Sequence, residues 1–174
     1  MNYEEWLKTV PAEITNDSLW KMAVYRYSLF AADIGWHDVS RLVRDHRTQD
    51  LSDQLYRSLG SIGANLAEGY SRSTGKDRAR FYEYALGSAR ECRNWYYKGQ
   101  HVLGPAVASH RMSMTAEIIK LLLKMVPEQR FHGPKLSPKA RSGSPSAHED
   151  AGAYPTSDTI DISQLLTNVP VCAD

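Results

Sequence analysis

Cysteine is scarce in this sequence of 174 residues, which contains only Cys92 and Cys172. Two cysteines cannot form a disulfide framework or a four-cysteine zinc site. The N-terminal stretch is acidic and holds no apolar run, so we expect no signal peptide. The richest apolar stretch, residues 118–126, contains Lys120 and Lys124 and is too short to span a bilayer. The sequence therefore indicates a cytoplasmic protein with no membrane partner.

An excess of either charge is also lacking, since 21 basic and 20 acidic residues leave a net charge of +1. This balance argues against a strongly basic nucleic-acid-binding protein, although a local basic patch is compatible with it. The charge divides along the chain. Residues 1–130 hold 18 basic and 15 acidic residues, a net charge of +3, and residues 131–174 hold 3 and 5, a net charge of −2.

Proline is nearly absent from residues 17–125, where only Pro105 occurs, whereas residues 131–174 hold five of the eight prolines. Those 44 residues also hold only two of the 17 aromatic residues, in a background rich in Ser and Gly. Such a segment cannot bury enough apolar surface to offset the entropy lost on ordering. We therefore expect an N-terminal extension over residues 1–16, a helical domain over 17–130 and a disordered Pro/Ser-rich tail over 131–174.

The end of the predicted tail contains an apolar cluster. Ser157 and Asp158 can cap a short helix that places Ile162, Leu165 and Leu166 on one side. So short a helix is mostly disordered in isolation, and such segments commonly fold on binding. The cluster indicates an unknown binding partner for the tail; an inert end with a chance cluster is the alternative.

Four helical segments occupy the predicted domain. The first begins near Asp17 and reaches about Arg47, the second covers about residues 51–70, and the third runs from about residue 76 to 103. The fourth follows Gly104 and Pro105 and ends at Pro127. No segment alternates polar and apolar residues as a strand does. The fold class that we predict is all-α, an antiparallel up-down four-helix bundle with a disordered C-terminal tail.

Two stripes suggest contacts beyond the simplest bundle. In the second helix the small residues are Gly60, Gly63, Ala64 and Ala67, which suit the close approach of another backbone or ordinary tight packing. The third helix has a sustained apolar seam, and its opposite side carries three further residues that we assign to a candidate oligomer interface: Ala79, Leu86 and Tyr97.

Sequence patterns for catalysis or cofactor binding are missing. A di-iron centre in a bundle needs Glu-x-x-His pairs, which the sequence lacks, and the six histidines show no ligand spacing. The stretch Gly69–Lys76 resembles a phosphate loop, but five residues separate its glycines and Asp77 takes the place of the required hydroxyl residue. We therefore predict a protein that is not an enzyme and holds no metal or cofactor.

Basic residues gather in two stretches that give candidate nucleic-acid contacts. Phosphate and base recognition uses arginines near aromatic side chains, although a charge run is more often a surface of ion pairs. The candidate contacts are Arg41, Arg44, Arg47, Arg72, Lys76, Arg78, Arg80, Arg90 and Arg93.

The run Ser-Ile-Gly-Ala-Asn-Leu-Ala-Glu-Gly over residues 61–69, followed by Arg72 and by the block over residues 85–91, resembles a known family. It is similar to the bacterial four-helix bundle proteins named for 23S rRNA intervening sequences, to which the retroelement accessory variability determinants are related. The resemblance is best over residues 51–104. It assigns a structural role to seven motif residues: Ser61, Ile62, Asn65, Ala67, Glu68, Gly69 and Arg72.

This resemblance implies a protomer that forms a ring with copies of itself, typically a homopentamer, and it implies no catalysis. The first hypothesis for function is therefore a non-enzymatic oligomeric scaffold or adaptor. The alternative, implied by the retroelement relatives, is an oligomer that binds RNA or DNA and is accessory to a reverse transcriptase. Those relatives are strongly basic, whereas residues 1–130 carry a net charge of only +3, which favours the scaffold.

Overall fold

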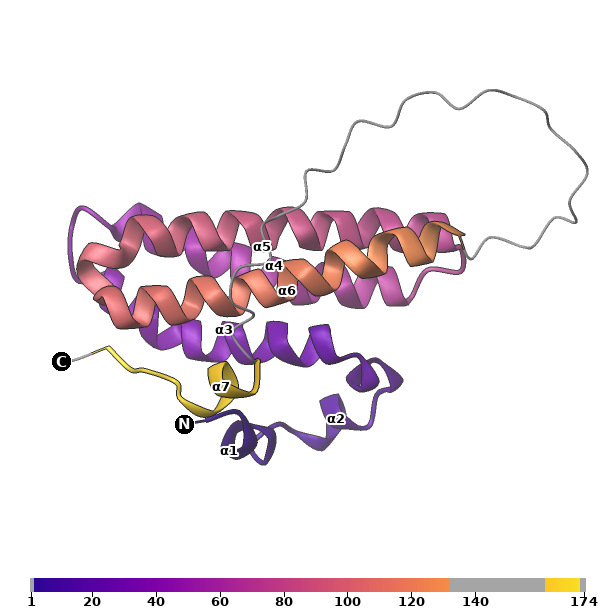
Figure 1. Cartoon of the computed structure of the whole chain (residues 1–174), viewed down its shortest axis with the longest axis horizontal. Helices are drawn as coiled ribbons and strands as arrows, with labels where there is room; N and C mark the ends of the chain where they lie inside the picture. Colours follow the sequence, from indigo (N-terminus) through magenta and orange to yellow (C-terminus); the bar gives the residue numbers. More distant parts are fainter. Residues whose placement is uncertain (1, 132–161, 173–174) are drawn as a thin grey trace, which may run out of the picture.

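The structure is a computed structural model that describes residues 2–131 and 162–172 (Figure 1). Its four long helices are α3 (Ala23–Leu42), α4 (Gln49–Tyr70), α5 (Gly75–Leu103) and α6 (Pro105–Phe131). Before them lie α1 (Tyr3–Leu7), α2 (Ala12–Thr15) and the 3-10 turn η1 (Ser18–Lys21), and after them lies α7 (Ile162–Thr167). Over these two ranges the chain forms no strand, which agrees with the predicted all-α class.

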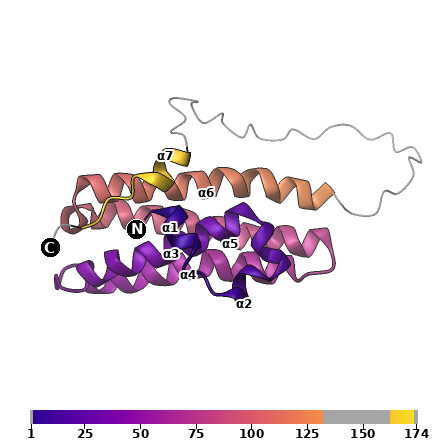
Figure 2. The same cartoon turned by 90° about the horizontal axis from the view of Figure 1, so that it is seen from below.

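The long helices form one bundle in which successive members run antiparallel (Figures 1 and 2). Short connections join α3 to α4, α4 to α5 and α5 to α6, and each helix packs against the next, while α6 also packs against α3. The α3–α4 and α5–α6 connections lie at one end of the bundle, and the α4–α5 connection lies at the other. The predicted up-down four-helix bundle is confirmed.

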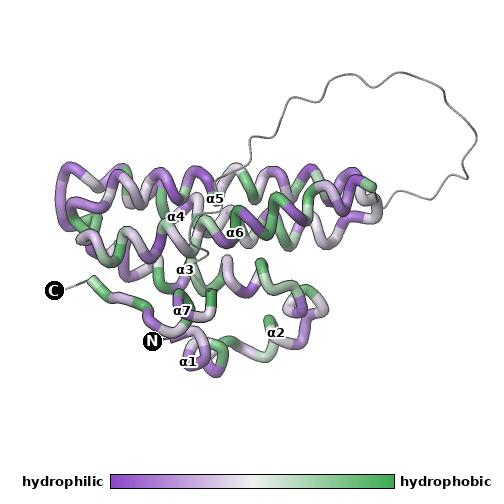
Figure 3. The backbone as a smooth tube through the Cα atoms, viewed as in Figure 1, coloured by the Kyte–Doolittle hydropathy of each residue, from purple (hydrophilic) through white to green (hydrophobic). Residues whose placement is uncertain are grey.

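Apolar periodicity accounts for the core. Leu55, Leu59, Ile62 and Leu66 of α4 are fully buried, as their spacing along one helical face predicts. Hydrophobic and hydrophilic residues alternate along each long helix, as Figure 3 shows. The seam predicted for the third helix is one edge of a wider buried face of α5, because only part of the seam is buried and other α5 residues share the core. Those other residues are Ala79, Tyr82, Leu86, Ala89, Tyr96 and Leu103.

The helix ends differ from the predicted ones at two places. Asp17 caps the 3-10 turn η1 by accepting a hydrogen bond from the Leu19 backbone N–H, and the α-helix starts only at Ala23. At the other end, α6 continues through Pro127 to Phe131. A proline inside a helix removes one backbone hydrogen bond, and here the carbonyl one turn earlier belongs to the exposed Leu123, so water is available to it.

Part of the predicted N-terminal extension belongs to the hydrophobic core. Tyr3 and Trp6 of α1 are buried, and their rings lie 5.5 Å apart. Each also packs on Phe30 of α3, with ring centroids 5.2 Å and 5.3 Å away. Such aromatic pairs contribute about 0.5–1.5 kcal/mol beyond the area they bury. The first helix of the chain is thus fixed to the outer side of α3.

The C-terminal segment, residues 162–172, corrects the prediction of a tail that is disordered throughout. It contains α7, whose Leu165 is buried and which packs against α6 and α1. The sequence places Leu165 and Leu166 on one side of a short helix, and in the structure that helix packs against the chain's own bundle. The predicted cap at Ser157 and Asp158, and the rest of the tail over residues 132–161, lie outside the described residues.

Candidate functional site

A charged pair lies inside the bundle between α3 and α6. Asp38 is 0% exposed and Arg111 is 3% exposed. The Arg111 guanidinium donates through Nε and Nη2 to the two carboxylate oxygens of Asp38, at 2.7 and 3.2 Å. The Tyr96 hydroxyl of α5 donates a third hydrogen bond to Asp38, at 3.0 Å. Because an unpaired buried charge is very costly, these three residues have to be treated as one unit.

The C-terminal segment completes the hydrogen bonding of this unit. Arg111 donates through Nη2 to the Pro170 carbonyl oxygen at 3.0 Å and through Nη1 to His110 Nδ1 at 2.8 Å. Since arginine can only donate, Nδ1 is the acceptor and the His110 proton sits on Nε2. That Nε2–H is 2.7 Å from the Leu165 carbonyl oxygen. Two residues of α6 therefore hold two backbone carbonyls of the segment.

Burial controls the ionisation of the groups around Asp38. It lowers the pKa of His110 and, with the neighbouring Asp38 carboxylate, raises the pKa of Tyr96 and of Cys172. The neutral forms of these three groups are therefore favoured near pH 7. The only full charges in the unit are those of Asp38 and Arg111, which compensate each other.

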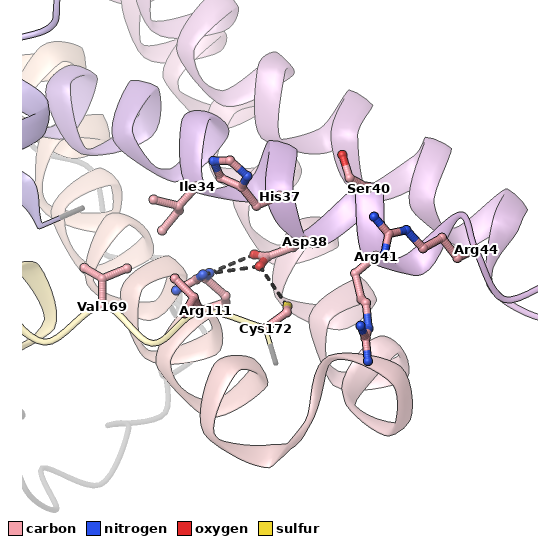
Figure 4. A pocket seen from close by; sticks show the side chains of 10 residues that line it. Ile34, His37, Asp38, Ser40, Arg41, Arg44, Arg111, Val169 and Cys172 are labelled. Carbon is pink, nitrogen blue, oxygen red and sulfur yellow. Dashed lines mark hydrogen bonds and ion pairs between the residues drawn. The ribbon is translucent and has the colours of Figure 1, made fainter. Parts of the chain in front are cut away.

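A hollow of about 270 Å³ lies beside this unit and is partly covered by the C-terminal segment (Figure 4). Residues at helical spacing along α3 line it, from Ile34 to Arg41, and Arg44 follows just after the helix. The aliphatic side chains that line it are Ile34, Val169 and Val171. Figure 4 shows Ile34 and Val169 on one side of Asp38 and Cys172, and Arg41 and Arg44 on the other.

A second, wider hollow of about 680 Å³ shares Arg41 and Arg44 with the first. It lies at the end of the bundle where α3 meets α4, and Arg47 and the histidines His46 and His101 also line it. Its one acidic residue, Asp45, is paired with Arg47. This end of the bundle is therefore basic.

The structure separates the predicted nucleic-acid contacts instead of joining them. Arg41, Arg44 and Arg47 lie at one end of α4, and Arg72 and the first residues of α5 lie at its other end. A helix of 22 residues spans about 33 Å, so the two clusters cannot form one patch on a protomer. Arg90 is exposed and Arg93 half-buried in the middle of α5.

Several of these cations are also engaged within the protomer. Arg47 pairs with Asp45 and Arg72 with Glu68. Arg78 is half-buried and donates to Gln129, while Arg80 donates to the Tyr84 hydroxyl. Lys76 and Arg80 share a hollow with the acidic residues Asp77 and Glu83. The stretch from Arg72 to Arg80 is therefore a surface of mixed charge.

The family-motif residues have structural roles at the junction of α4 and α5. Ile62 is in the core, and Gly69 lies directly under the Tyr82 ring. The Ser61 hydroxyl is 2.9 Å from that of Ser88, and the Asn65 amide donates to the Ser61 carbonyl oxygen. Glu68 pairs with Arg72 one turn later, and Ala67 is half-buried.

Two of the three residues predicted for an oligomer interface cannot serve there as expected. Ala79 is 1% exposed and Leu86 is 9% exposed within the single chain, because α5 packs against α6 on that side as well as against α4. Only Tyr97, at 59% exposed, faces outward. The second apolar side of α5 is explained by its own bundle.

The small-residue stripe of α4 is divided between a face that packs against α3 and an exposed face. Gly63 of the small-residue stripe faces α3, where a methyl group would lie 3.2 Å from the Ser28 hydroxyl oxygen. Gly60 has nothing within 4 Å of that position, and Ala64 is exposed. The neighbouring α3 carries Trp36, 54% exposed, with its ring 5.6 Å from that of Tyr56.

The buried pair was missed from the sequence, although a signal for it exists. Asp38 lies four residues after Ile34 and four before Leu42, on the apolar stripe of its helix. Arg111 likewise continues the stripe of Val107 and Met114. One acid and one base, each alone on a core-facing stripe, indicate a buried ion pair.

The described residues contain no cluster of His, Cys, Asp and Glu side chains suited to a metal ion. None of the helices in residues 2–131 and 162–172 combines the length and the apolar character needed to cross a membrane.

Comparison with known proteins identifies relatives of the bundle. The model of a family described as 23S rRNA-intervening sequence protein matches residues 21–124. The chain is also similar to the crystal structure of a protein with unknown function from the S23 ribosomal protein family of Bacteroides thetaiotaomicron. That similarity has a TM-score of 0.56 and 25% sequence identity, and it covers 60% of this chain and 98% of the other. No curated protein matches the chain.

Proposed function

The chain belongs to the 23S rRNA-intervening sequence protein family, and on this premise we propose that it is a non-enzymatic oligomeric scaffold or adaptor that self-associates through the outer face of α4. Neither the family description nor that of the solved relative names a catalytic activity. The ring of copies, a pentamer in the family resemblance, would present the same surface of every protomer around one axis.

The observation that carries this proposal is the empty space above Gly60. Glycine inside a helix costs about 1 kcal/mol relative to alanine, and an added methyl group at Gly60 would meet nothing within 4 Å. No packing in the protomer requires a glycine there. Together with the exposed Ala64 one turn later, Gly60 forms a low strip on which the backbone of a second copy can approach closely.

Exposed aromatic side chains beside the strip support the same use. Trp36 and Tyr56 lie where α3 meets α4, at 54% and 44% exposed, and Tyr84 of the adjacent α5 is 46% exposed. Large aromatic residues with a polar tip are enriched at protein interfaces. Exposed aromatic side chains of this kind could pack against a helix of another copy.

Light scattering coupled to size exclusion tests the proposal. The wild type at micromolar concentration should have a mass several times 19.6 kDa. Ala64→Arg should shift the mass toward that of the monomer, because a guanidinium would be desolvated in the contact. Ser109→Arg on the exposed side of α6 is the matched control and should leave the mass unchanged. A monomeric wild type, or equal masses for all three proteins, would contradict the proposal.

Nucleic-acid binding is the alternative function, and the basic end of the bundle favours it. Arg41, Arg44 and Arg47 would be repeated around a ring, so that a modest charge per protomer becomes a continuous field. Gel shifts with RNA and DNA at two salt concentrations test this alternative. Binding that weakens steeply with salt and is reduced by Arg47→Ala would support it, with Arg57→Ala on α4 as the control.

A further inference from the structure

The narrower hollow beside Asp38 has the features of a ligand site, which neither the fold nor the proposed scaffold function requires. Its volume of about 270 Å³ is just below the range of roughly 300–1,000 Å³ usual for ligand pockets. It is bounded by α3, by Arg111 of α6 and by residues 169–172. A hollow of this size excludes a folded nucleic acid and suits a small molecule.

Within residues 2–131 and 162–172, the cationic side of the hollow has no acidic partner of its own. Arg41 and Arg44 are three residues apart, which places them as neighbours one turn from each other. Among the described residues, neither guanidinium forms a hydrogen bond or an ion pair. Asp38 is the only acidic residue among the described residues that line the hollow, and Arg111 already holds both of its oxygens. The C-terminus of α3 contributes only about half a negative charge, less than the two guanidinium groups.

The other side of the hollow is apolar. Ile34 is buried and Val169 half-buried, while Val171 is 75% exposed at the edge. An aliphatic side chain so exposed gains nothing from the fold, but it can cover part of an apolar ligand. Figure 4 shows the aliphatic and cationic residues on opposite sides of Asp38, so a ligand along α3 would meet both.

We propose that this hollow binds a small organic anion whose carboxylate or phosphate group lies against Arg41 and Arg44 and whose short apolar body lies against Ile34, Val169 and Val171. Guanidinium groups form charge-assisted hydrogen bonds with either head group. The polar centre of the site is already satisfied by the Asp38–Arg111 pair, so the ligand does not have to compete for it.

The site also depends on the C-terminal segment, which contributes Val169, Val171 and Cys172 to the lining. A ligand that needs these residues binds the chain only when the segment is docked. By linkage, ligand binding then stabilises the docked segment. A bound ligand would thus indicate that the C-terminal segment is docked on the bundle.

Calorimetric titration of the full-length protein with four probes tests the proposal. Phenylacetate and phenyl phosphate combine an anionic head with an apolar body and should bind, and their relative affinities identify the preferred head. Phenylacetamide lacks the charge and inorganic phosphate lacks the body, so each should bind at least about tenfold more weakly. Amide hydrogen exchange in residues 162–172 should slow when phenylacetate or phenyl phosphate is present.

Two variants test whether the anionic head group of the ligand lies against Arg41 and Arg44. Arg41→Gln and Arg44→Gln should each weaken the anionic probes about tenfold, whereas Arg90→Gln on the exposed surface of α5 should change nothing. Circular dichroism verifies that each variant folds. Arg44 is exposed, so its variant still tests the proposal if the Arg41 variant misfolds. Three results would overturn the proposal: equal affinity for phenylacetate and phenylacetamide, affinity that neither variant changes, or no binding at ~10 mM.

Discussion

Arg111 on α6 and Asp38 on α3 form a two-point ion pair almost completely removed from water. The pair joins the last long helix of the bundle to the first, and Tyr96 of α5 donates to the same carboxylate. It therefore fixes the register of three helices with respect to one another. The C-terminal segment docks on the same pair through the Pro170 carbonyl oxygen.

Breaking this pair from one side should destabilise the bundle strongly. Arg111→Met leaves a buried carboxylate unpaired, and Asp38→Leu leaves a buried guanidinium, so each should lower the free energy of unfolding by about 3–5 kcal/mol. The double variant should lose less than either single variant, because no buried charge is left alone. Urea unfolding followed by circular dichroism measures these differences.

A surface pair provides the control for that experiment. Arg57 and Asp53 pair on α4 with both side chains 72% exposed, and Arg57→Ala should cost no more than about 1 kcal/mol. Equal losses for the buried and the exposed variants, or single losses that simply add in the double variant, would show that Asp38 and Arg111 are not energetically coupled.

Acid should release the C-terminal segment through His110. The ordinary pKa of an imidazole is near 6.5. Burial, the largest influence, lowers the pKa of the docked His110, while its hydrogen bond to the Leu165 carbonyl oxygen opposes this shift, and we expect release to restore part of the lost hydration. Protons therefore bind more tightly to the released form. Docking is fully favourable above about pH 6.5 and is lost as the pH falls through the lower, docked pKa. Protonation at Nδ1 would also turn a hydrogen toward Arg111, which donates there.

Amide hydrogen exchange in residues 162–172 at about pH 7.5 and about pH 5.5 measures this release. Protection of the segment should fall at the lower pH by more than the intrinsic exchange rates explain. In His110→Gln the amide can accept from Arg111 and donate to the Leu165 carbonyl oxygen without titrating, so its protection should not depend on pH. A variant with the wild-type pH dependence would contradict the role of His110.

The bundle was predictable because its determinants are local and periodic. The stripe from Leu55 to Leu66 gives the buried face of α4 without knowledge of the other helices. The docking of α7 was not predictable in that way. Leu165 is buried because its segment packs against α6 and α1, and His110 and Arg111, more than 50 residues earlier, hold backbone carbonyls of that segment. The composition of residues 131–174 does not reveal such contacts, because they form only when the fold brings distant residues together.

The burial of the residues predicted for an oligomer interface also could not be read from the sequence. Leu86 lies off the seam that a single partner helix would need, so its sequence position indicated a second partner. The second partner is α6, which covers another side of α5 than α4 does. Periodicity shows how many faces of a helix are buried, but only the packing shows whether a face is covered by the same chain or by another.

Two glycines of α4 should respond in opposite ways to the same added methyl group. At Gly69 the methyl carbon would lie 2.7 Å from the Tyr82 ring, which is buried and rigid, so Gly69→Ala should destabilise the fold by about 1–3 kcal/mol. At Gly60 it would meet nothing within 4 Å, so Gly60→Ala should raise the stability of the protomer by about 0.5–1 kcal/mol. Thermal unfolding measures the change in stability of each variant. If both variants were stabilised or both destabilised, the packing described for Gly69 or for Gly60 would be wrong.

Removing every residue after Phe131 should leave the four-helix bundle folded but less stable. The family match ends within α6 at residue 124, and almost all of the solved relative corresponds to 60% of this chain, so we expect the bundle core to fold without α7. The truncated chain loses the burial of Leu165 and the two carbonyl acceptors of His110 and Arg111. Water can replace the acceptors, so the loss should be about 1–3 kcal/mol, or a few degrees in melting temperature.

The same truncation separates docking from folding in two further measurements. Helical circular dichroism should fall only by the few residues of α7, and calorimetry with phenylacetate should show no binding because Val169 and Val171 are gone. Leu165→Ala in the full-length chain is the matched variant, since it weakens docking and leaves the carbonyl groups in place. An unchanged melting temperature after truncation would show that the segment contributes nothing to the folded chain. A collapse of helix content would show instead that the bundle needs the segment in order to fold.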